Sequence, residues 1–276
     1  MAKTDPSVLS VFAELVSRHL EPLNDEHRAR KQVRRAVRAV LADGGPAVAM
    51  QPIIRIASME VAGYEALARF PRNPRWTPDR WFRHAEQVGL GPALEAAAVH
   101  AALQHLPCLP PAMSLNINVS AGALLAGSAI QTMVSDAGNA ARVVLELTEH
   151  QSITHPEELS EALSSLRMAG VRIAVDDAGS GYAGLERVVS IGPEVLKIDR
   201  GLVGGVADHP RRRAMCEALV GFAQRTGTLL IAEGVETEAD LRALRGLGVT
   251  HAQGFLLGHP STTAPHFRAA AVSTLE

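Results

Sequence analysis

Carboxylate and amide side chains follow several short apolar runs of this chain, at the points where each run gives way to polar sequence. In chain order these residues are Glu65, Asn116, Asn118, Glu146, Glu149, Asp176, Asp177, Asp199, Glu233 and Gln253. Carboxylates that converge repel one another and raise their own pKa values unless cations neutralise them. Oxygen-only ligands, without His or Cys at ligand spacing, suit Mg²⁺ or Mn²⁺ better than zinc. The pattern therefore predicts a site for divalent metal ions.

Two features of this set favour the hydrolysis of a phosphodiester. Asp176 and Asp177 are adjacent, so one of them can ligate two ions while the other ligates one. Two metal ions about 3.5–4 Å apart activate a water and stabilise both the attacking and the leaving oxygens of a phosphodiester. Lys197 lies within an apolar run, in a chain whose only other lysines are Lys3 and Lys31. Its compact ammonium suits a phosphate or a nucleophilic water.

Each residue also has an ordinary structural interpretation. Glu65 alone fits a solvent-facing strand position, and Asn118 fits a turn. The adjacent aspartates fit a helix N-cap, and Lys197 fits a surface side chain whose stem packs on apolar atoms. The functional interpretation depends on the joint pattern, because capping alone does not place acidic or amide residues at the ends of seven consecutive strands.

The elements that must position these side chains are predicted to be eight short strands that alternate with helices. The expected strands are Ala47–Ile54, Glu60–Arg69, Met113–Val119, Val143–Thr148, Val171–Asp176, Val195–Asp199, Leu229–Ala232 and His251–Phe255. Eight such units predict a (β/α)8 barrel, in which functional residues lie at the carboxyl ends of the strands. Residues 57–59 are too short a link for a parallel crossover. The predicted fold class is therefore α/β, a TIM-like barrel with an antiparallel first strand.

Helices are expected between the strands and ahead of the barrel. The expected helices between strands include Trp81–Leu103, Pro156–Ala169, Arg212–Thr226 and Glu238–Leu247. Residues 1–45 are predicted to form an N-terminal helical extension of two helices, and residues 46–276 the barrel domain. The apolar stripe of the first helix, from Val8 to Leu20, needs a partner. The basic run from His27 to Lys31 in the second is typical of a solvated helix face.

Composition restricts the class of protein. The 276 residues carry a net charge of −2, which leaves no positive excess for a polyanion, so nucleic acid is not expected as the main partner. Cys108 and Cys216 cannot build a disulfide framework, and neither a signal peptide nor a transmembrane segment is expected. A cytoplasmic protein is predicted. Isolated histidines such as His150 and His251 are assigned no role.

The ordered motifs of residues 47–260 resemble those of the EAL-domain family of bacterial cyclic di-GMP phosphodiesterases. The matching segments are Gln51-Pro52-Ile53, Glu65-Ala66-Leu67 with Arg69, Asn118-Val119-Ser120, Glu146-Leu147-Thr148-Glu149, Asp176-Asp177, Lys197-Ile198-Asp199, Glu233-Gly234-Val235-Glu236-Thr237 and Gln253-Gly254. The family's barrel also has an antiparallel first strand. The resemblance implies a metal-dependent phosphodiesterase that hydrolyses cyclic di-GMP to linear 5′-pGpG.

The resemblance also implies a role for each matching residue. The first of two Mg²⁺ or Mn²⁺ ions would be held by Glu65, Asn118, Glu146 and Asp176. The second would be held by Asp176, Asp177 and Glu233. The catalytic residues would be Glu233, Lys197 and Glu65. The substrate or the attacking water would be contacted by Gln51, Leu67, Arg69, Asp199 and Gln253, while the loop after the adjacent aspartates would be anchored by Glu149.

Three hypotheses about function stay open at this point. The first is the active enzyme, favoured because every ligand and lysine position is filled. The second is a receptor that binds cyclic di-GMP without cleaving it, and the third is a DNA-binding regulator that uses the basic residues at 27–38. Ala178 stands where the family often has Phe, and Met50 where an aromatic residue is frequent, which leaves the regulation of the loop open. The family's tendency to pair through its barrel favours a homodimer.

Overall fold

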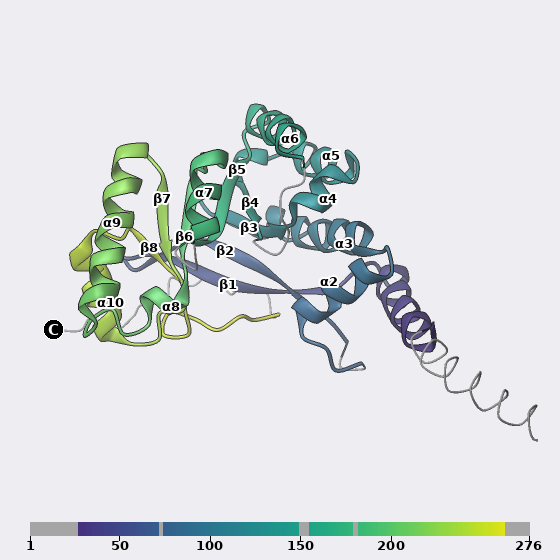
Figure 1. Cartoon of the computed structure of the whole chain (residues 1–276), viewed down its shortest axis with the longest axis horizontal. Helices are drawn as coiled ribbons and strands as arrows, with labels where there is room; N and C mark the ends of the chain where they lie inside the picture. Colours follow the sequence, from purple (N-terminus) through teal and green to yellow (C-terminus); the bar gives the residue numbers. More distant parts are fainter. Residues whose placement is uncertain (1–26, 72–73, 149–154, 179–181, 263–276) are drawn as a thin grey trace, which may run out of the picture.

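Eight strands close a barrel at the centre of the computed structural model, which describes residues 27–71, 74–148, 155–178 and 182–262 (Figure 1). The strands are β1 (Ala47–Arg55), β2 (Glu60–Arg69), β3 (Ser114–Val119), β4 (Val143–Leu147), β5 (Arg172–Ala178), β6 (Val195–Ile198), β7 (Leu229–Ala232) and β8 (His251–Ala252). Strand β1 is antiparallel to both β2 and β8, and the other neighbouring pairs are parallel. The predicted barrel and its reversed first strand are confirmed.

The side chains inside the barrel lie in layers, because successive residues of a strand point to opposite faces of the sheet. A buried apolar cluster inside the barrel consists of Ile53, Val144, Ala174, Val195 and Ile231. Each parallel strand of this cluster carries a polar residue two positions further toward its carboxyl end. These residues are Glu146, Asp176, Lys197 and Glu233. The residues between them, such as Leu145 and Leu196, join the larger core outside the barrel. The apolar layer therefore forms a floor beneath the polar side chains at the barrel mouth.

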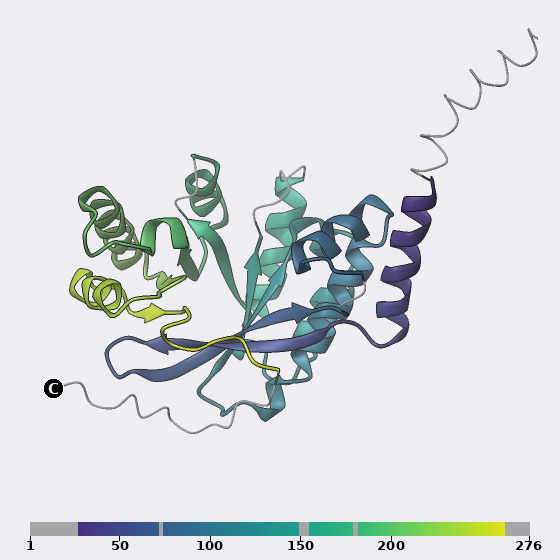
Figure 2. The ribbon, with the colours of Figure 1, turned by 90° about the horizontal axis from the view of Figure 1, so that it is seen from below.

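Helices surround the barrel on its outer face (Figures 1 and 2). They are α2 (Pro78–Gln87), α3 (Gly91–Leu103), α4 (Ala121–Leu125), α5 (Ala129–Ser135), α6 (Pro156–Met168), α7 (Tyr182–Ile191), α8 (Arg200–Val203), α9 (Pro210–Thr226) and α10 (Glu238–Leu247). Short 3₁₀ turns at Leu106–Cys108 and Ala140–Arg142 precede β3 and β4. In the described part of the chain, no helix has the length and apolar character needed to cross a membrane.

Two predicted elements are wrong in extent. The single helix expected over Trp81–Leu103 is two helices, because Gly89 adopts a φ of 71° after α2 and a proline begins α3. Strand β8 ends at Ala252 rather than at Phe255. The backbone turns after Gln253, where a Cβ on Gly254 would meet the Val235 backbone at 2.2 Å, so only glycine allows this close approach.

A helix over residues 27–42 packs on α2 and α3 at the end of the molecule away from α9 and α10 (Figure 1). Its Val37 and Val40 are buried against Trp81 and Leu94. Arg34 donates a hydrogen bond to the carbonyl oxygen of Val88, where α2 ends and carbonyls lack helical partners. The basic run from His27 to Lys31 is exposed throughout, as expected of a solvated helix face, and its Arg30 also donates to the carbonyl oxygen of Gln87. The first expected helix lies outside the described residues, and the domain boundary near residue 45 stays a prediction.

Candidate functional site at the barrel mouth

The Lys197 ammonium lies at the centre of the polar layer, in contact with carboxylates from four other strands or strand ends. Its Nζ is 2.5 Å from Glu233 Oε1, 2.7 Å from Glu146 Oε2, 3.4 Å from Glu65 Oε2 and 3.9 Å from Asp176 Oδ1. Lys197 and Glu146 are completely buried. The structure thus brings together five residues that the sequence placed at separate strand ends, and Lys197 is no surface residue.

Amide side chains hold two of these carboxylates in place. Asn118 donates through Nδ2 to Glu65 Oε1 at 2.8 Å, and Asn116 donates through Nδ2 to Glu146 Oε1 at 2.7 Å. Strand β3 lies between β2 and β4, and Asn116 and Asn118 stand level with Glu65 and Glu146 respectively. One strand therefore supplies amides to carboxylates on both of its neighbours. Asn116 was expected to share a face with Asn118 but was given no role in the site. Its near-complete burial and its bond to Glu146 make it a supporting residue.

A second amide pair joins the site to the end of the barrel domain. Gln253 donates through Nε2 to Glu65 Oε2 at 2.6 Å and to Gln51 Oε1 at 2.9 Å. Gln51 in turn donates to the Gly258 carbonyl at 3.1 Å. The segment that follows β8 runs back along β1, where Met50 and Ser261 pair (Figure 2). Gln253 Oε1 is buried and has no hydrogen-bond partner among the described residues, so an acceptor is left available inside the site.

Charge and burial oppose each other within this cluster. Burial raises the pKa of Glu146 well above its ordinary value, and burial raises the pKa of Glu233 to about 8; the Lys197 charge opposes both shifts. Burial would also raise the pKa of Glu65, but Lys197 and the bonds from Gln253 and Asn118 hold it lower. The carboxylates, Glu146 first, outweigh burial and raise the pKa of Lys197 well above its usual value. The cluster therefore carries more carboxylate than one ammonium can neutralise.

The two adjacent aspartates lie where the barrel is irregular. The β5–β6 register shifts between Val175 and Ala178, so both aspartates fall in a bulge. Bulges re-aim side chains and occur next to active sites. Asp176 reaches the Lys197 ammonium as described above. Asp177 belongs to β5, but its side chain is outside the described part of the structure.

The remaining predicted residues lie around this centre with different surroundings. Leu67 and Arg69 follow Glu65 at alternate positions of β2 and are half-buried. Arg69 donates to the Ala68 carbonyl; burial lowers its pKa, and the Glu65 charge opposes this shift. Asp199 caps α8 by accepting a bond from the Gly201 amide at 2.8 Å. Glu149 lies outside the described residues, so its anchoring role stays a prediction.

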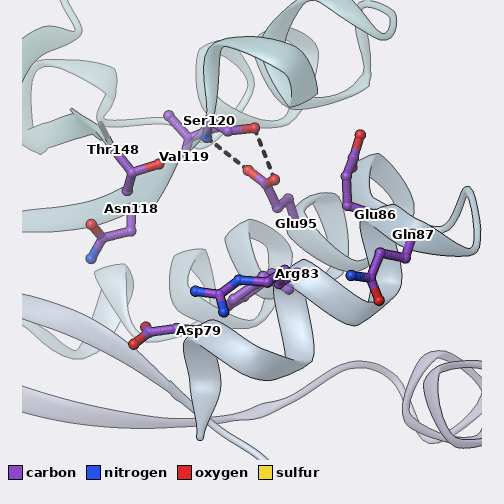
Figure 3. Close-up of a pocket in the computed structure, with 10 residues that line it drawn as sticks. Asp79, Arg83, Glu86, Gln87, Glu95, Asn118, Val119, Ser120 and Thr148 are labelled. Carbon is purple, nitrogen blue, oxygen red and sulfur yellow. Dashed lines mark hydrogen bonds between the residues drawn. The ribbon is translucent and has the colours of Figure 1, made fainter. Parts of the chain in front are cut away.

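A cavity of about 430 Å³ adjoins the site on the side of α2 and α3 (Figure 3). Asn118 lines it together with Asp79, Arg83, Gln87 and Thr148. In Figure 3, Asp79, Arg83 and Asn118 extend toward the same side of the cavity. The cavity offers charged and amide groups beside the carboxylate cluster, with room for more than an ion.

Glu95 is a wall residue of this cavity that sequence reasoning missed. Its carboxylate accepts bonds from the Ser120 amide at 2.7 Å and the Ser120 hydroxyl at 2.8 Å (Figure 3). These bonds join α3 to the residue that follows β3, two positions after Asn118. Burial raises the pKa of Glu95, while the bonds from Ser120 oppose this shift. A lone carboxylate in the otherwise apolar stretch from Gly91 to Leu103 was the available signal.

The same side chains explain why no ready-made metal cage is seen. Across the described ranges, no three His, Cys, Asp or Glu side chains converge in an arrangement that could hold a metal ion as they stand. The Lys197 ammonium occupies the space between the carboxylates. The donor chemistry nevertheless fits Mg²⁺ or Mn²⁺, since the available ligand atoms are carboxylate and amide oxygens.

Comparison with known proteins places these features in a family context. Residues 30–260 match the family model of the EAL domain. An uncharacterized signaling protein of Caulobacter vibrioides is 30% identical over 246 residues, which cover 87% of this chain and 30% of that protein. A probable cyclic di-GMP phosphodiesterase of Escherichia coli, PdeA, is 29% identical over 237 residues, which cover 83% of this chain and 32% of that protein. The chain spans about a third of the length of the first curated relatives it matches.

Solved structures are similar over most of the chain. The PaMucR phosphodiesterase, in complex with c-di-GMP, matches with a TM-score of 0.72 at 28% identity, covering 83% of this chain and 97% of that chain. Klebsiella pneumoniae BlrP1, in complex with manganese and cyclic di-GMP, matches with a TM-score of 0.70 at 29% identity, covering 79% of this chain and 56% of that chain. The fold of this chain is therefore similar to that of two proteins solved with cyclic di-GMP bound.

Proposed function

This chain belongs to the EAL domain family, and we propose that it is a metal-dependent phosphodiesterase that hydrolyses cyclic di-GMP to linear 5′-pGpG. The observation that carries the proposal is the cluster of four carboxylates around one buried ammonium at the barrel mouth. A structural ion pair needs one carboxylate for one ammonium. The surplus here favours a site that takes up further positive charge.

Divalent cations fit this surplus. Added positive charge would lower the pKa values of Glu146 and Glu233, which burial raises. One ion would be held by Glu65, Asn118, Glu146 and Asp176, and a second by Asp176, Asp177 and Glu233. Bound Mg²⁺ or Mn²⁺ would supply Lewis-acid stabilisation of the phosphodiester oxygens and lower the pKa of a water. Gln253 Oε1, which has no partner within the described ranges, would accept a hydrogen bond from a water at the mouth.

Lys197 and Glu233 would have different roles in the hydrolysis. Lys197 donates from a buried position that is already charged, so it stabilises negative charge that develops in the transition state without reorganisation. Glu233 is the side chain with a raised pKa that is partly open to the mouth, which suits a group that receives a proton from the attacking water.

The substrate would extend from the carboxylate cluster into the neighbouring cavity. Arg69 would contact a phosphate from the end of β2, with Gln51 and Leu67 beside it. A guanine base would lie in the 430 Å³ cavity, where Asp79 and Arg83 offer an acceptor and donors for its polar edge. Asp199 is proposed to contact substrate only if it leaves its capping bond to Gly201. The expected homodimer and the cytoplasmic location stay predictions.

The test is hydrolysis of cyclic di-GMP by the full chain, with Mg²⁺ or Mn²⁺ and then with a chelator, followed by chromatography of the products. We expect 5′-pGpG with metal and none with chelator. Glu65→Gln should lower turnover by about a hundredfold or more, comparable to losing a group that stabilises transition-state charge. Glu158→Gln, at an exposed position of α6, is the matched control and should retain wild-type turnover.

Two outcomes would contradict the proposed phosphodiesterase activity. Tight binding of cyclic di-GMP with no turnover in either metal would favour the receptor hypothesis. Turnover by Glu65→Gln within a few fold of wild type would contradict the metal and catalytic roles of the cluster. Circular dichroism of both variants separates loss of activity from loss of fold.

A further inference from the structure

A second pocket lies at the opposite end of the barrel from the carboxylate cluster. It has a volume of about 130 Å³, which is more than one water needs. Its upper wall is the apolar layer of Ile53, Val144, Val195 and Ile231, which separates it from the mouth. Its polar groups come from the amino ends of parallel strands and from the end of β1. They are Arg55, Ser114, Asn116, Arg172 and His251. We call this the basal pocket.

The strand register brings the basic residues of the basal pocket together. Arg55 and His251 are direct partners in the β1–β8 pair, so their side chains start on the same face of the sheet. Arg172 stands two residues before Ala174 of the apolar layer, and His251 stands two residues before Gln253 of the mouth. Both positions therefore share the inward face with the residues above them.

The basal pocket is electrostatically the reverse of the mouth. Of its lining residues within the described ranges, three are basic and none is acidic. Two acids outside the lining lie beside its arginines: Glu60 is 3.7 Å from Arg55, in an ion pair in which both side chains are more than half exposed. Glu194, which faces Arg172, already accepts bonds from Arg167 and from the Ile173 amide.

The pKa of His251 reflects both the burial and the positive charge of this pocket. Burial first, and then the charges of Arg55 and Arg172, lower the pKa of His251 to about 4. His251 is therefore neutral near pH 7, and its Nδ1 lies 2.9 Å from the Thr250 hydroxyl. A neutral imidazole can donate one ring N–H without adding a third charge.

We propose that the basal pocket binds a small oxyanion of the phosphate class. Two guanidinium groups match the oxygens of a phosphate in charge and in planar, paired donor geometry. The Ser114 hydroxyl and His251 add neutral donors on the pocket wall. Arg55, whose side chain is 52% exposed, leaves the pocket open to solvent on one side. The proposal does not depend on the reaction at the mouth.

The test is calorimetric titration of the full chain with inorganic phosphate, in chloride buffer of constant ionic strength with chelator present. Arg172→Gln and Arg55→Gln should each weaken binding by about tenfold, because each removes charge-assisted hydrogen bonds. Arg242→Gln, on the exposed face of α10, is the matched control and should bind as wild type does. The His251 ring resonance should shift on titration at pH 7, a change that a merely structural histidine would not show.

Further titrations identify the class of ligand and the site at which it binds. Guanosine monophosphate in place of inorganic phosphate shows whether the bound phosphate can carry an ester group; binding by either one supports the proposal. Arg69→Gln changes the mouth alone and should leave the affinity for phosphate unchanged. Loss of binding in Arg69→Gln but not in the Arg55 and Arg172 variants would place the anion at the mouth and overturn the proposal. So would equal affinity for acetate, or no heat and no His251 shift at millimolar phosphate. If Arg172→Gln does not fold, the phosphate affinity of Arg55→Gln and the shift of the His251 ring resonance test the proposal.

Discussion

Lys197 shows how burial and charge determine each other at the barrel mouth. Burial alone would favour the neutral amine, yet four carboxylates lie within 3.9 Å of its Nζ and keep it charged. The same burial disfavours ionised Glu146 and Glu233, which share a single neighbouring cation. Burial therefore raises the pKa values of these carboxyl groups, and the charge of one side chain, Lys197, opposes the shift.

Replacing Lys197 by the similarly long but apolar Met should cost both stability and activity. Without the ammonium, Glu146 is left buried without its counter-charge, and breaking a buried pair costs about 3–5 kcal/mol. Turnover of cyclic di-GMP should fall far more than affinity, since the ammonium acts on charge that is largest in the transition state. Urea unfolding and steady-state kinetics on the two proteins measure both effects.

Lys197→Arg provides the matched comparison. A planar guanidinium does not fit a fully buried space shaped for one nitrogen at 2.5 and 2.7 Å from two carboxylates, so it should rescue poorly. Full rescue by Arg would mean that only net charge matters. A change confined to the Michaelis constant would contradict the transition-state role.

Asn116 supports the site without belonging to the proposed ligands. Its amide holds Glu146 Oε1 at 2.7 Å, and loss of such an outer partner lowers metal affinity or activity by about 10–100-fold. We therefore expect Asn116→Leu to weaken activation by Mn²⁺ within that range, measured as turnover against metal concentration. Asn139→Ala, at an exposed asparagine before β4, is the control and should change nothing. An unaltered metal dependence in Asn116→Leu would show that Glu146 is oriented by Lys197 alone.

Residue types at strand ends were readable from sequence, but their contacts were not. Glu65, Glu146 and Glu233 could be predicted because they lie near the ends of apolar runs, and Lys197 because it interrupts one. The bond between Glu95 and Ser120 depends on how α3 packs against β3, which no local pattern reveals. The basic residues of the basal pocket were hidden for the same reason, since they begin or end strands that only the closed barrel brings together.

At the scale of elements, short apolar runs predicted the strands to within two residues at most ends, but helical apolar periodicity misled where two helices meet. The stretch from Trp81 to Leu103 keeps a helical pattern across its interruption, and burial on both sides hides the break. Gly89 and Pro92 were the local signals, because glycine past a helix end and proline just inside the next one are typical of such a junction. The break bends the chain so that α2 and α3 both line the cavity at the mouth.

Gly89 should be sensitive to a side chain for a purely conformational reason. A Cβ at this position would meet no atom within 4 Å, but φ is 71°. We expect Gly89→Ala to destabilise the protein by about 1–2 kcal/mol, the cost of a left-handed conformation. Gly246→Ala, at an exposed position in the last turn of α10 with nothing within 4 Å, should instead stabilise it slightly, by at most about 0.5–1 kcal/mol. Urea denaturation measures the free energy of unfolding of both variants. Equal changes at the two positions would contradict a conformational cost specific to Gly89.

At the scale of the whole molecule, the barrel separates two opposite electrostatic surroundings by one apolar layer. The mouth gathers carboxylates and the basal pocket gathers arginines, while the net charge of the chain is only −2. Near-neutral composition therefore concealed two locally charged sites. The extension ahead of β1 adds a third feature, because the helix over residues 27–42 shares a core with α2 and α3, the helices that wall the cavity.

Two truncations separate the roles of the N-terminal region. Removing residues 1–42 would expose Trp81 and Leu94, which pack on Val37 and Val40, and should cost about 3 kcal/mol or more of stability at about 1.5–3 kcal/mol per buried aliphatic side chain. Removing residues 1–26 leaves that core intact, so it should leave stability unchanged while weakening a homodimer that uses the stripe from Val8 to Leu20. Light scattering and urea unfolding on both proteins check this. If the protein without residues 1–26 keeps the oligomeric state and turnover of the full chain, these residues are neither interface nor regulator. If the protein without residues 1–42 is as stable as the full chain, the helix over residues 27–42 is dispensable to the core that it covers.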